Sequence, residues 1–384
     1  MRFPEFTEEW ESVLLEDVAE FQKKRISSDL LNNSNYISTE NILQNFGGVQ
    51  NSISIPANTN VIEYQRGDVL LSNIRPYLKK VWLSDRHGGC SADVFVLRGN
   101  QCERRFLYYV IASDRFINFV MSGAKGVKMP RGDKSQMEKF TFFIPTNVEQ
   151  KKIAMFLSML DERIRLQNKI IEKYESLIQA MCDTLIGKKT QQVMLSFNDF
   201  GESYSGLSGK SAEDFGEGSP YITYMNVYQN QIIDITDIGL VKINKTEQQS
   251  LVQYGDILFT LSSETPEEVG MGAVYLGETY PLYLNSFCFG IHITDESKIF
   301  PPFLAYYVSS ESFRKAVFPL AQGSTRFNLQ KGDFLKKVFP FPAIEQQRKI
   351  YSILKTYSDK LNIEKQMIKL LCCQKQYLLR QLFI

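Results

Sequence analysis

"VEQKKIAMFLSMLDERIRLQNKIIEKYESLIQAM" (residues 148–181) has the pattern of a long amphipathic helix, and the 384-residue chain repeats that pattern in "EQQRKIYSILKTYSDKLNIEKQMIKLLCCQKQYL" (345–378). Alternating steps of four and three residues from Ile153 and from Ile350 follow an apolar seam in each segment. A seam that keeps a period of 3.5 residues over more than four heptads indicates coiled-coil packing. The seam residues are Ile153, Leu157, Leu160, Ile164, Gln167 and Ile171, and Ile350, Leu354, Leu361, Glu364, Ile368 and Leu371.

Both seams have their first polar residue at the same place. Gln167 and Glu364 lie 197 residues apart, as do Ile153 and Ile350. A polar group inside a coiled-coil seam weakens the coil but can fix its register and partner. We hypothesise that these two residues occupy equivalent layers and set the pairing.

A long stretch of sequence with globular composition separates the two helices, so they can meet antiparallel within one chain. About 33 residues at a rise of ~1.5 Å give each helix a length of roughly 50 Å. This geometry predicts a rod with one globular part at each end, the two being related by a pseudo-twofold axis.

The globular parts also repeat each other. Short matches occur in the same order in both halves, and a proline precedes each helix. The matches are "YISTEN" (36–41) with "YITYMN" (221–226), "RGDVLLSNI" (66–74) with "YGDILFTLS" (254–262), "FLYYVIASDRF" (106–116) with "FLAYYVSSESF" (303–313), and "GAKGVKMPRGD" (123–133) with "GSTRFNLQKGD" (323–333).

The repeat predicts four parts: globular residues 1–147, a helix at 148–187, globular residues 188–344 and a helix at 345–384. Each globular part has short β-type runs broken by Gly, Asn and Ser, such as "DVFVLR" (93–98) and "FCFGIHI" (287–293). Each also has one helix-like stretch, at 103–120 and near 302–317. We expect an α+β fold with two mixed domains, each followed by a long helix, and with the two helices paired as an antiparallel coiled coil.

Composition bounds the function only loosely. The 44 basic and 43 acidic residues give a net charge of +1, which neither demands nor excludes a polyanionic partner. None of the six cysteines forms a C-x-x-C pair and only two histidines are present, so a zinc site is not expected. The sequence contains no apolar run long enough to span a membrane and no signal-peptide pattern at its start. A cytoplasmic protein with reduced thiols is expected.

Several motifs carry a family resemblance. They are "P-x-x-x-E-Q-K-K-I" (145–153), "PAIEQQRKI" (342–350), "GDVLLSNIRPYLKKVWLSDRHGGCSADVFVLR" (67–98) and "YGDILFTLSSETPEEVGMGAVYL" (254–276). Together with the duplicated layout, they make essentially the whole chain resemble the specificity (S) subunits of type I restriction–modification systems.

The resemblance implies a non-catalytic DNA reader. Each globular part would be a target-recognition domain for one half of a split sequence in double-stranded DNA. The helices would be the spacer and the docking surface for two methyltransferase (M) subunits, and restriction (R) subunits would complete the nuclease. This chain would hold no cofactor, and S-adenosylmethionine, ATP and Mg would be bound by the partner subunits. A rod of about 50 Å spans at most ~1.5 turns of B-DNA, so the half-sites would lie about one turn apart.

The glycine-rich basic loops are candidates for phosphate contact, because backbone N–H groups and cations together suit phosphate oxygens. The alternative is a solvated surface loop. In the first half, the candidates are Lys125, Lys128, Arg131 and Lys134; in the second half they are Ser324, Arg326 and Lys331.

Base reading is expected in the loop "SNIRPYLKK" (72–80), because Arg and Asn can form bidentate contacts with guanine and adenine. Its candidates are Asn73, Arg75, Lys79 and Lys80. The corresponding "TLSSETPEEVG" (260–270) is acidic and hydroxylic, and offers Ser262, Ser263 and Thr265, with Glu264 as an acceptor for cytosine. For each single residue a plain surface turn is the alternative. Since the halves differ most in these loops, unlike half-sites are predicted.

Enzymatic alternatives find little support. A methyltransferase fragment would need a [DN]-P-P-[YF] loop, but "FPPF" (300–303) has Phe300 in place of the polar acceptor. "GMG" (270–272) lacks the strand–loop–helix setting of a cofactor site. The remaining alternative is a coiled-coil scaffold that binds only proteins, and the basic loops before both helices argue against it.

Overall fold

The computed structural model describes residues 2–126, 128–187, 192–244, 246–278 and 280–383. It divides into two compact units, which we call unit 1 (Met1–Asn168 and Gln366–Ile384) and unit 2 (Lys169–Lys365). Each unit therefore holds one globular part and a half of each long helix. Among the described helices, none is both long and apolar enough to cross a membrane.

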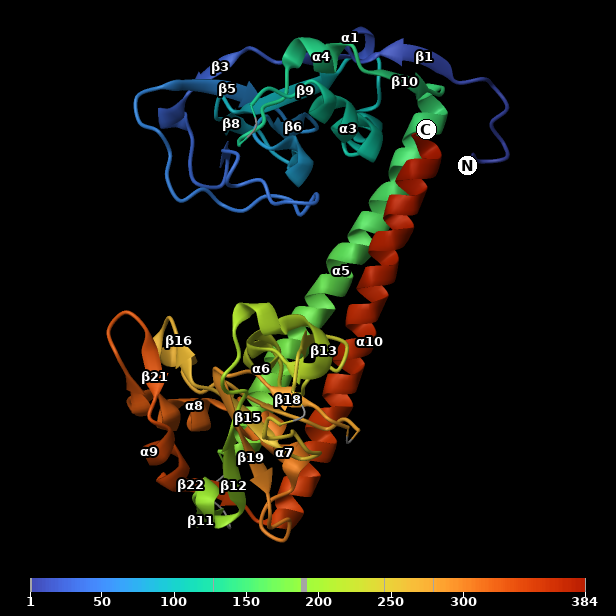
Figure 1. Cartoon of the computed structure of the whole chain (residues 1–384). Coiled ribbons are helices and arrows are strands. Elements are labelled where there is room, and N and C mark those ends of the chain that lie inside the picture. The colour runs from blue at the N-terminus through green and yellow to red at the C-terminus, as the bar shows by residue number, and fades with distance from the viewer. Residues whose placement is uncertain (1, 127, 188–191, 245, 279, 384) are drawn as a thin grey trace. The chain divides into compact units, whose positions relative to one another are not determined.

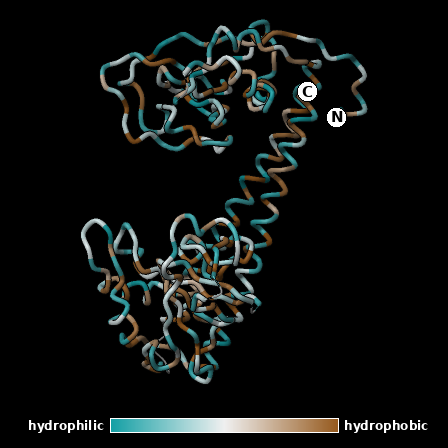
Figure 2. The backbone as a smooth tube through the Cα atoms, in the orientation of Figure 1, coloured by the Kyte–Doolittle hydropathy of each residue, from teal (hydrophilic) through white to brown (hydrophobic). Residues whose placement is uncertain are grey.

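The two long helices are α5 (Asn147–Ile186) and α10 (Ile344–Leu382). Both begin one residue before the predicted boundaries. Their 40 and 39 residues correspond to about 60 Å each. This exceeds the expected ~50 Å because that length was based on about 33 residues for each helix. Hydrophobic residues recur at short intervals along both helices (Figure 2).

In unit 1 the start of α5 packs against the end of α10 (Figure 1). Leu157 of α5 and Leu378 of α10 belong to one apolar core. Beside it, Lys375 Nζ lies 2.5 Å from Asp161 Oδ1.

In unit 2 the order is reversed, and the end of α5 packs against the start of α10. Cys182 and Leu354 share its apolar core, and Lys365 Nζ lies 2.7 Å from Glu175 Oε1. The two pairings can hold together only if the helices run antiparallel, which confirms the predicted coiled-coil arrangement.

The predicted seam matches the buried stripe of both helices. All twelve predicted seam residues are buried or half-buried, whereas most residues between them are exposed. Gln167 is only 6% exposed and Glu364 is half-buried, so polar groups do lie within the seam. That they occupy equivalent layers and set the register stays a prediction.

Among its described residues, the globular part of unit 1 contains two four-stranded sheets and a two-stranded ribbon. The ribbon pairs β1 (Glu11–Leu14) with β10 (Thr141–Ile144). One sheet has the order β2 (Ala19–Phe21), β9 (Val94–Gly99), β6 (Val69–Ser72), β7 (Val81–Leu83), and the other β3 (Arg25–Ser27), β5 (Asn60–Tyr64), β8 (Gly88–Cys90), β4 (Tyr36–Ile37). The short helices are α1 (Leu15–Val18), α2 (Arg104–Ile111), α3 (Asp114–Ser122) and α4 (Lys134–Glu138).

The globular part of unit 2 repeats the ribbon and one four-stranded sheet of this plan, and its other described sheets are three-stranded. Its ribbon pairs β11 (Gln192–Leu195) with β22 (Phe339–Pro342). Its sheets have the orders β12 (Gly201–Ser205), β19 (Cys288–Ile293), β15 (Ile257–Thr260), β17 (Gly272–Val274), then β14 (Ile238–Val241), β13 (Phe215–Ile222), β18 (Tyr283–Leu284), and β16 (Ser262–Ser263), β21 (Phe327–Leu329), β20 (Ala321–Gln322). The helices are α6 (Tyr224–Gln229), α7 (Pro301–Tyr307), α8 (Glu311–Val317) and α9 (Lys331–Lys336).

The predicted single helix at 103–120 is wrong, since α2 and α3 are separate helices. Ser113 ends the first and begins the second, because its Oγ donates to Val110 O at 2.7 Å and accepts from Phe116 N at 3.2 Å. Ser310 divides α7 from α8 in the same way. A serine that caps the next helix competes with continuation of the previous one.

The predicted alignment of the two basic loops is also wrong, by three residues. Aligning their glycines placed Gly132 opposite Gly332. In the structure Gly132 N donates to Asn73 O, as Leu329 N donates to Leu261 O. The true spacing is therefore 197 residues, as in the helices, and Lys331 corresponds to Lys134 rather than to Arg131.

The shared "E-Q" of both helix starts has a structural role. Gln150 Oε1 accepts from Glu103 N, and its Nε2 donates to Pro145 O, both at 2.8 Å. Gln347 makes the same two bonds, to Phe300 N and Pro342 O, at 2.9 Å. Each glutamine thereby joins the first turn of a long helix to its own globular part.

Replacing Gln150 or Gln347 by Ala is expected to destabilise its unit by about 1–3 kcal/mol, because buried backbone groups lose their partners. Gln346→Ala, at an exposed neighbouring position, is the control. Urea unfolding measures the difference. Equal stability of the Gln347→Ala and Gln346→Ala variants would contradict this role.

Replacing Gln167 and Glu364 together by Leu is expected to raise the melting temperature, by about 2–4 °C for each kcal/mol gained, because apolar layers pack better in a coiled coil. The matched control replaces the exposed neighbours Asn168 and Gln366 by Leu. Calorimetry provides the readout. An unchanged or lower melting temperature for the seam variant would refute the hypothesis that these residues trade stability for register.

Candidate nucleic-acid interface

In unit 1, the structure brings together the two loops predicted to touch DNA, residues 72–80 and 123–134. Arg75 N donates to Pro130 O at 2.8 Å, and Gly132 N donates to Asn73 O at 3.1 Å. Ile74 and Arg131 form a β-bridge between them. We call these joined segments the loop pair of unit 1.

The backbone of the loop at 72–80 is strained at two predicted residues. Arg75 (φ 50°, ψ 65°) and Lys79 (φ 51°, ψ 44°) are left-handed and flank the 3₁₀ turn Pro76–Leu78. Left-handed backbone is unfavourable for residues with a side chain, and such strain concentrates at functional sites. Asn45 N and Phe46 N support the turn by donating to Leu78 O and Lys79 O, both at 3.1 Å.

Buried polar atoms without a partner lie in the loop pair of unit 1 and in the adjoining helix α4. Within the described part of the chain, Asn73 Oδ1, Arg75 Nε and Gln136 Oε1 are buried and lack a hydrogen bond. Gln136 Oε1 lies against Gly123, where a Cβ would be only 2.1 Å away. Leaving such groups unpaired costs about 1–3 kcal/mol each. A polar ligand that turns these side chains outward would complete the missing bonds.

Two predicted base-reading lysines are held by the protein itself. Lys79 Nζ lies 2.5 Å from Asp114 Oδ1, and this hydrogen bond is the main reason that the pKa of the Asp114 carboxyl is lowered. Arg380 also reaches Asp114, at 3.2 Å. Lys80 Nζ donates to Thr39 O at 2.6 Å. In this arrangement both lysines brace the loop.

The cations of the glycine-rich loop are similarly engaged, with one exception. Lys125 pairs with Asp133 at 2.6 Å, Arg131 with Asp93 at 3.4 Å and Lys134 with Glu138 at 3.5 Å. Lys128 is exposed, and the described residues offer it no salt bridge or hydrogen bond. Among the described residues, Lys128 is therefore the predicted phosphate-binding lysine of unit 1 that is exposed and has no internal partner.

Unit 2 joins the corresponding segments in the same way, and we call residues 260–270 and 323–333 the loop pair of unit 2. Strand β16 pairs with β21, with Ser262 opposite Asn328 and Ser263 opposite Phe327. Leu329 N donates to Leu261 O at 2.8 Å. Figure 1 shows β16 and β21 next to each other on the side of unit 2 away from α10.

Ser262 and Ser263, which were predicted to contact DNA, are only 5% and 6% exposed and lie in the strand that pairs with β21. That they contact DNA stays a prediction. Ser263 Oγ donates to Glu268 Oε2 at 3.1 Å. Hydrogen bonds from Tyr228, and then from Thr265 and Ser263, lower the pKa of the Glu268 carboxyl.

The remaining predicted residues of unit 2 differ in accessibility. Thr265, Ser324 and Arg326 are exposed, the last two between β20 and β21. Lys331 is half-buried, with its Nζ 5.1 Å from the centre of the Phe289 ring, and burial lowers its pKa. Lys331 therefore faces the protein more than solvent.

Sequence reasoning missed several residues of the two loop pairs. Asn45 and Phe46 support the loop at 72–80 through backbone bonds, and Gln136 Nε2 donates to Phe119 O of α3. No sequence pattern indicated these bonds. Phe287, next to the unit 2 hairpin, is 55% exposed, although an aromatic residue at the edge of a β-type run reads as core.

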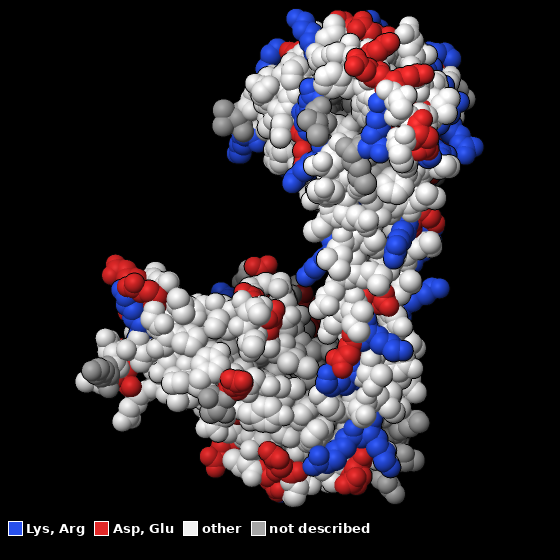
Figure 3. Space-filling model, turned by 90° about the vertical axis from the view of Figure 1, so that its right-hand side faces the viewer, with Lys and Arg blue, Asp and Glu red and all other residues white. Residues whose placement is uncertain are grey.

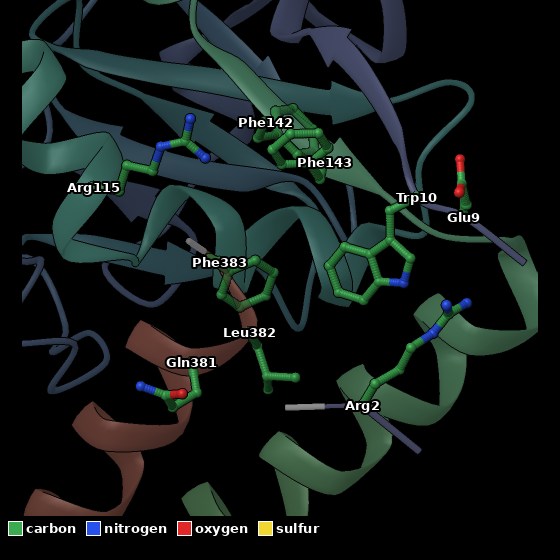
Figure 4. A pocket seen from close by; sticks show the side chains of 9 residues that line it. All are labelled: Arg2, Glu9, Trp10, Arg115, Phe142, Phe143, Gln381, Leu382 and Phe383. Carbon is green, nitrogen blue, oxygen red and sulfur yellow. The ribbon is translucent and has the colours of Figure 1, made fainter. Parts of the chain in front are cut away.

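A separate cavity of about 470 Å³ lies in unit 1 near the end of α10 (Figure 4). Its wall has one carboxylate and neither histidine nor cysteine, so it lacks a nucleophile with a base. The lining residues are Arg2, Glu9, Trp10, Arg115, Phe142, Phe143, Gln381, Leu382 and Phe383. Nowhere among the described residues do three or more His, Cys, Asp or Glu gather in a way that could hold a metal.

Surface charge is mixed in sign. Figure 3 shows Lys and Arg interspersed with Asp and Glu along the helices on the face that it presents. The net charge of +1 agrees with this mixture. Attraction for a polyanion must therefore come from local groups such as those of the loop pairs.

Comparisons with known proteins agree with this architecture. The family described as "Type I restriction modification DNA specificity domain" matches residues 7–176 and again 194–371. The "Type I restriction enzyme MjaVIII specificity subunit" of Methanocaldococcus jannaschii is 24% identical over 93% of this chain and 88% of its own length. The EcoKI specificity subunit of Escherichia coli is 27% identical, over 36% of this chain and 29% of its own length.

Two solved structures share the fold. A chain from a study of complex assembly and conformational transition in the type I R-M system has a TM-score of 0.61 at 18% identity, and 97% of each chain is covered. The type I S subunit from M. genitalium has a TM-score of 0.58 at 17% identity, with 98% of this chain and 96% of that chain covered. This chain belongs to the type I restriction–modification specificity family, and is a non-catalytic specificity subunit with two DNA specificity domains.

Proposed function

We propose that each unit reads one half of a bipartite DNA sequence through its own loop pair, and that the helix pair sets the distance between the halves. The proposal rests on a hydrogen-bonded contact that occurs in both units. In unit 1 the segment after β6 bonds to the segment before α4, and in unit 2 the segment after β15 bonds to the segment before α9. A repeated surface on an internally duplicated chain suits a ligand with two reading sites.

Unit 1 is proposed to read bases through Asn73 and Arg75, and phosphates through Lys128. Arg75 is only half-buried, and the terminal N–H groups of its guanidinium suit the edge of guanine, the most frequent specific contact of arginine. An exposed lysine on a glycine-rich loop supplies charge without sequence information. The unit 2 loops have different side chains, so the two half-sites are expected to differ.

Two methyltransferase subunits are the proposed partners of the helices, and restriction subunits are proposed to join them in the cytoplasm. The names of the relatives, which are specificity subunits of type I restriction enzymes, support this proposal. S-adenosylmethionine, ATP and Mg would then be bound by those subunits.

Methylation-aware sequencing of a host that expresses this chain with its methyltransferase subunit tests the proposal. The expected product is methylation at one split sequence with a fixed gap. Absence of methylation, together with no gel shift on genomic fragments with or without the methyltransferase, would instead support a scaffold that binds only proteins.

Arg75→Ala is expected to relax one base position in one half-site, at a cost of about 1–3 kcal/mol in discrimination. Lys128→Ala is expected to weaken binding to all sequences and to reduce the salt slope by about 1. Competition binding at several salt concentrations separates the two effects. If Lys128→Ala relaxed the specificity and Arg75→Ala weakened binding to all sequences, the two proposed roles would be wrong.

Deleting one heptad from each helix, residues 168–174 and 365–371, is expected to shorten the gap between the half-sites by about three base pairs. A heptad corresponds to ~10 Å of helix, and a base pair to ~3.4 Å of B-DNA. The methylated motif of the variant gives the answer. Unchanged half-sites with an unchanged gap, in a folded variant, would refute the role of the helices as a spacer.

A further inference from the structure

Phe287 and Arg326 of unit 2 form a contact that the predicted site did not include. Phe287 is 55% exposed, and the guanidinium carbon of Arg326 lies 5.7 Å from the centre of its ring. A single exposed apolar residue does not by itself indicate a function. An aromatic ring in contact with an exposed arginine does indicate one here, because the ring restricts the directions in which the guanidinium can point.

The backbone fixes Phe287 to the loop pair of unit 2. Leu261 N donates to Phe287 O at 2.9 Å, and Leu329 N donates to Leu261 O at 2.8 Å. Phe287 N donates to Asn285 Oδ1 at 2.9 Å. The segment that carries Phe287, the segment before β16 and strand β21 are therefore bonded in series.

The hairpin between β20 and β21 fixes the position of Arg326. Gln322 pairs with Asn328 at its base. Gly323 has φ +139°, and a Cβ there would lie 2.1 Å from Arg326 O, so a residue with a side chain would not fit. This close approach places Arg326 on a tight turn rather than on a loose loop.

The guanidinium of Arg326 keeps its hydrogen-bond donors available. In the part of unit 2 that the structure describes, the ring of Phe287 is its contact and neither a carboxylate nor a carbonyl binds it. Arg314 behaves differently, since it donates to the carbonyl oxygens of Glu267, Val269 and Gly270. A guanidinium held by an aromatic ring retains donors that match the guanine edge.

Unit 1 has the same arrangement with different chemistry. Asn73 N donates to Asp93 O at 2.8 Å, as Leu261 N donates to Phe287 O, so Asp93 and Phe287 are equivalent. Asp93 also holds an arginine of the opposite loop, Arg131, at 3.4 Å. The residue before the same strand thus positions a loop arginine in both units, through a carboxylate in unit 1 and through a ring in unit 2.

We propose that Phe287 positions Arg326 to read a guanine in the half-site of unit 2. The proposal rests on the function proposed above and names a base-reading arginine and its positioning residue. Arg326 contacts the guanine edge, and Phe287 sets the direction of the guanidinium. In unit 1 the position equivalent to Arg326 is Met129, so this reading element belongs to unit 2 alone.

The test compares Arg326→Lys, Arg326→Ala and Phe287→Leu in the reconstituted complex with methyltransferase subunits. Lys336→Ala, at an exposed cation of α9, is the control. Arg326→Lys keeps the charge but loses the bidentate geometry, so it is expected to reduce discrimination at one guanine by roughly 10- to 100-fold with little change in salt slope. Phe287→Leu is expected to weaken discrimination at that same position.

The affected guanine must lie in the half-site that substitutions in residues 72–80 leave unchanged. If both Arg326 variants keep the motif and only Arg326→Ala lowers affinity for all sequences, Arg326 is a phosphate contact and the proposal is overturned. Full discrimination by a folded Phe287→Leu variant would overturn the positioning role. Absence of methylation at a split sequence by the wild-type complex would instead contradict the function proposed for the whole chain, and so is distinct from failure of the Arg326 proposal.

Discussion

The antiparallel packing of α5 against α10 is the contact on which the rest of the molecule depends. Each unit contains the beginning of one helix and the end of the other, so neither globular part has a complete helical support from its own repeat. Leu157 of the first repeat shares a core with Leu378 of the second, and Leu354 of the second shares a core with Cys182 of the first. The glutamines at 150 and 347 then connect each helix start to its own sheet through buried backbone groups.

The loop pairs combine a rigid base with incomplete polar groups. In unit 1 the left-handed Arg75 and Lys79 are held by neighbouring backbone and by the Asp114 ion pair, while Asn73 and Arg75 keep buried atoms without partners. In unit 2 the serines are used to hold Glu268, and Arg326 is presented on a tight turn. The same backbone frame therefore carries different chemistry in each half, as the proposed reading of two unlike half-sites would require.

The periodic features could be predicted from the sequence, and the nonlocal ones could not. The seam from Ile153 and Ile350 was predicted because a 3.5-residue period is visible in one dimension. The burial of Ser262 and Ser263 depends on pairing with a strand more than sixty residues away, which no local pattern records. The loop alignment failed because two glycines matched by coincidence while backbone bonds set the register. Arg75 adopts a left-handed backbone conformation although arginine does not favour that conformation, so the strain there could not be predicted from the sequence.

Disulfide cross-linking between the helices tests the central pairing most directly. Cysteines would be introduced at Asp161 with Lys375, and separately at Glu175 with Lys365, after Cys372 and Cys373 have been replaced by Ser. Both pairs are predicted to form a disulfide within one chain under mild oxidation, since the salt bridges show that these positions lie on facing turns of the two helices. Asp161 with Lys369, which lies more than one turn along α10, is predicted to react poorly. Cross-links only between chains, or equal reaction of the mismatched pair, would contradict the antiparallel register.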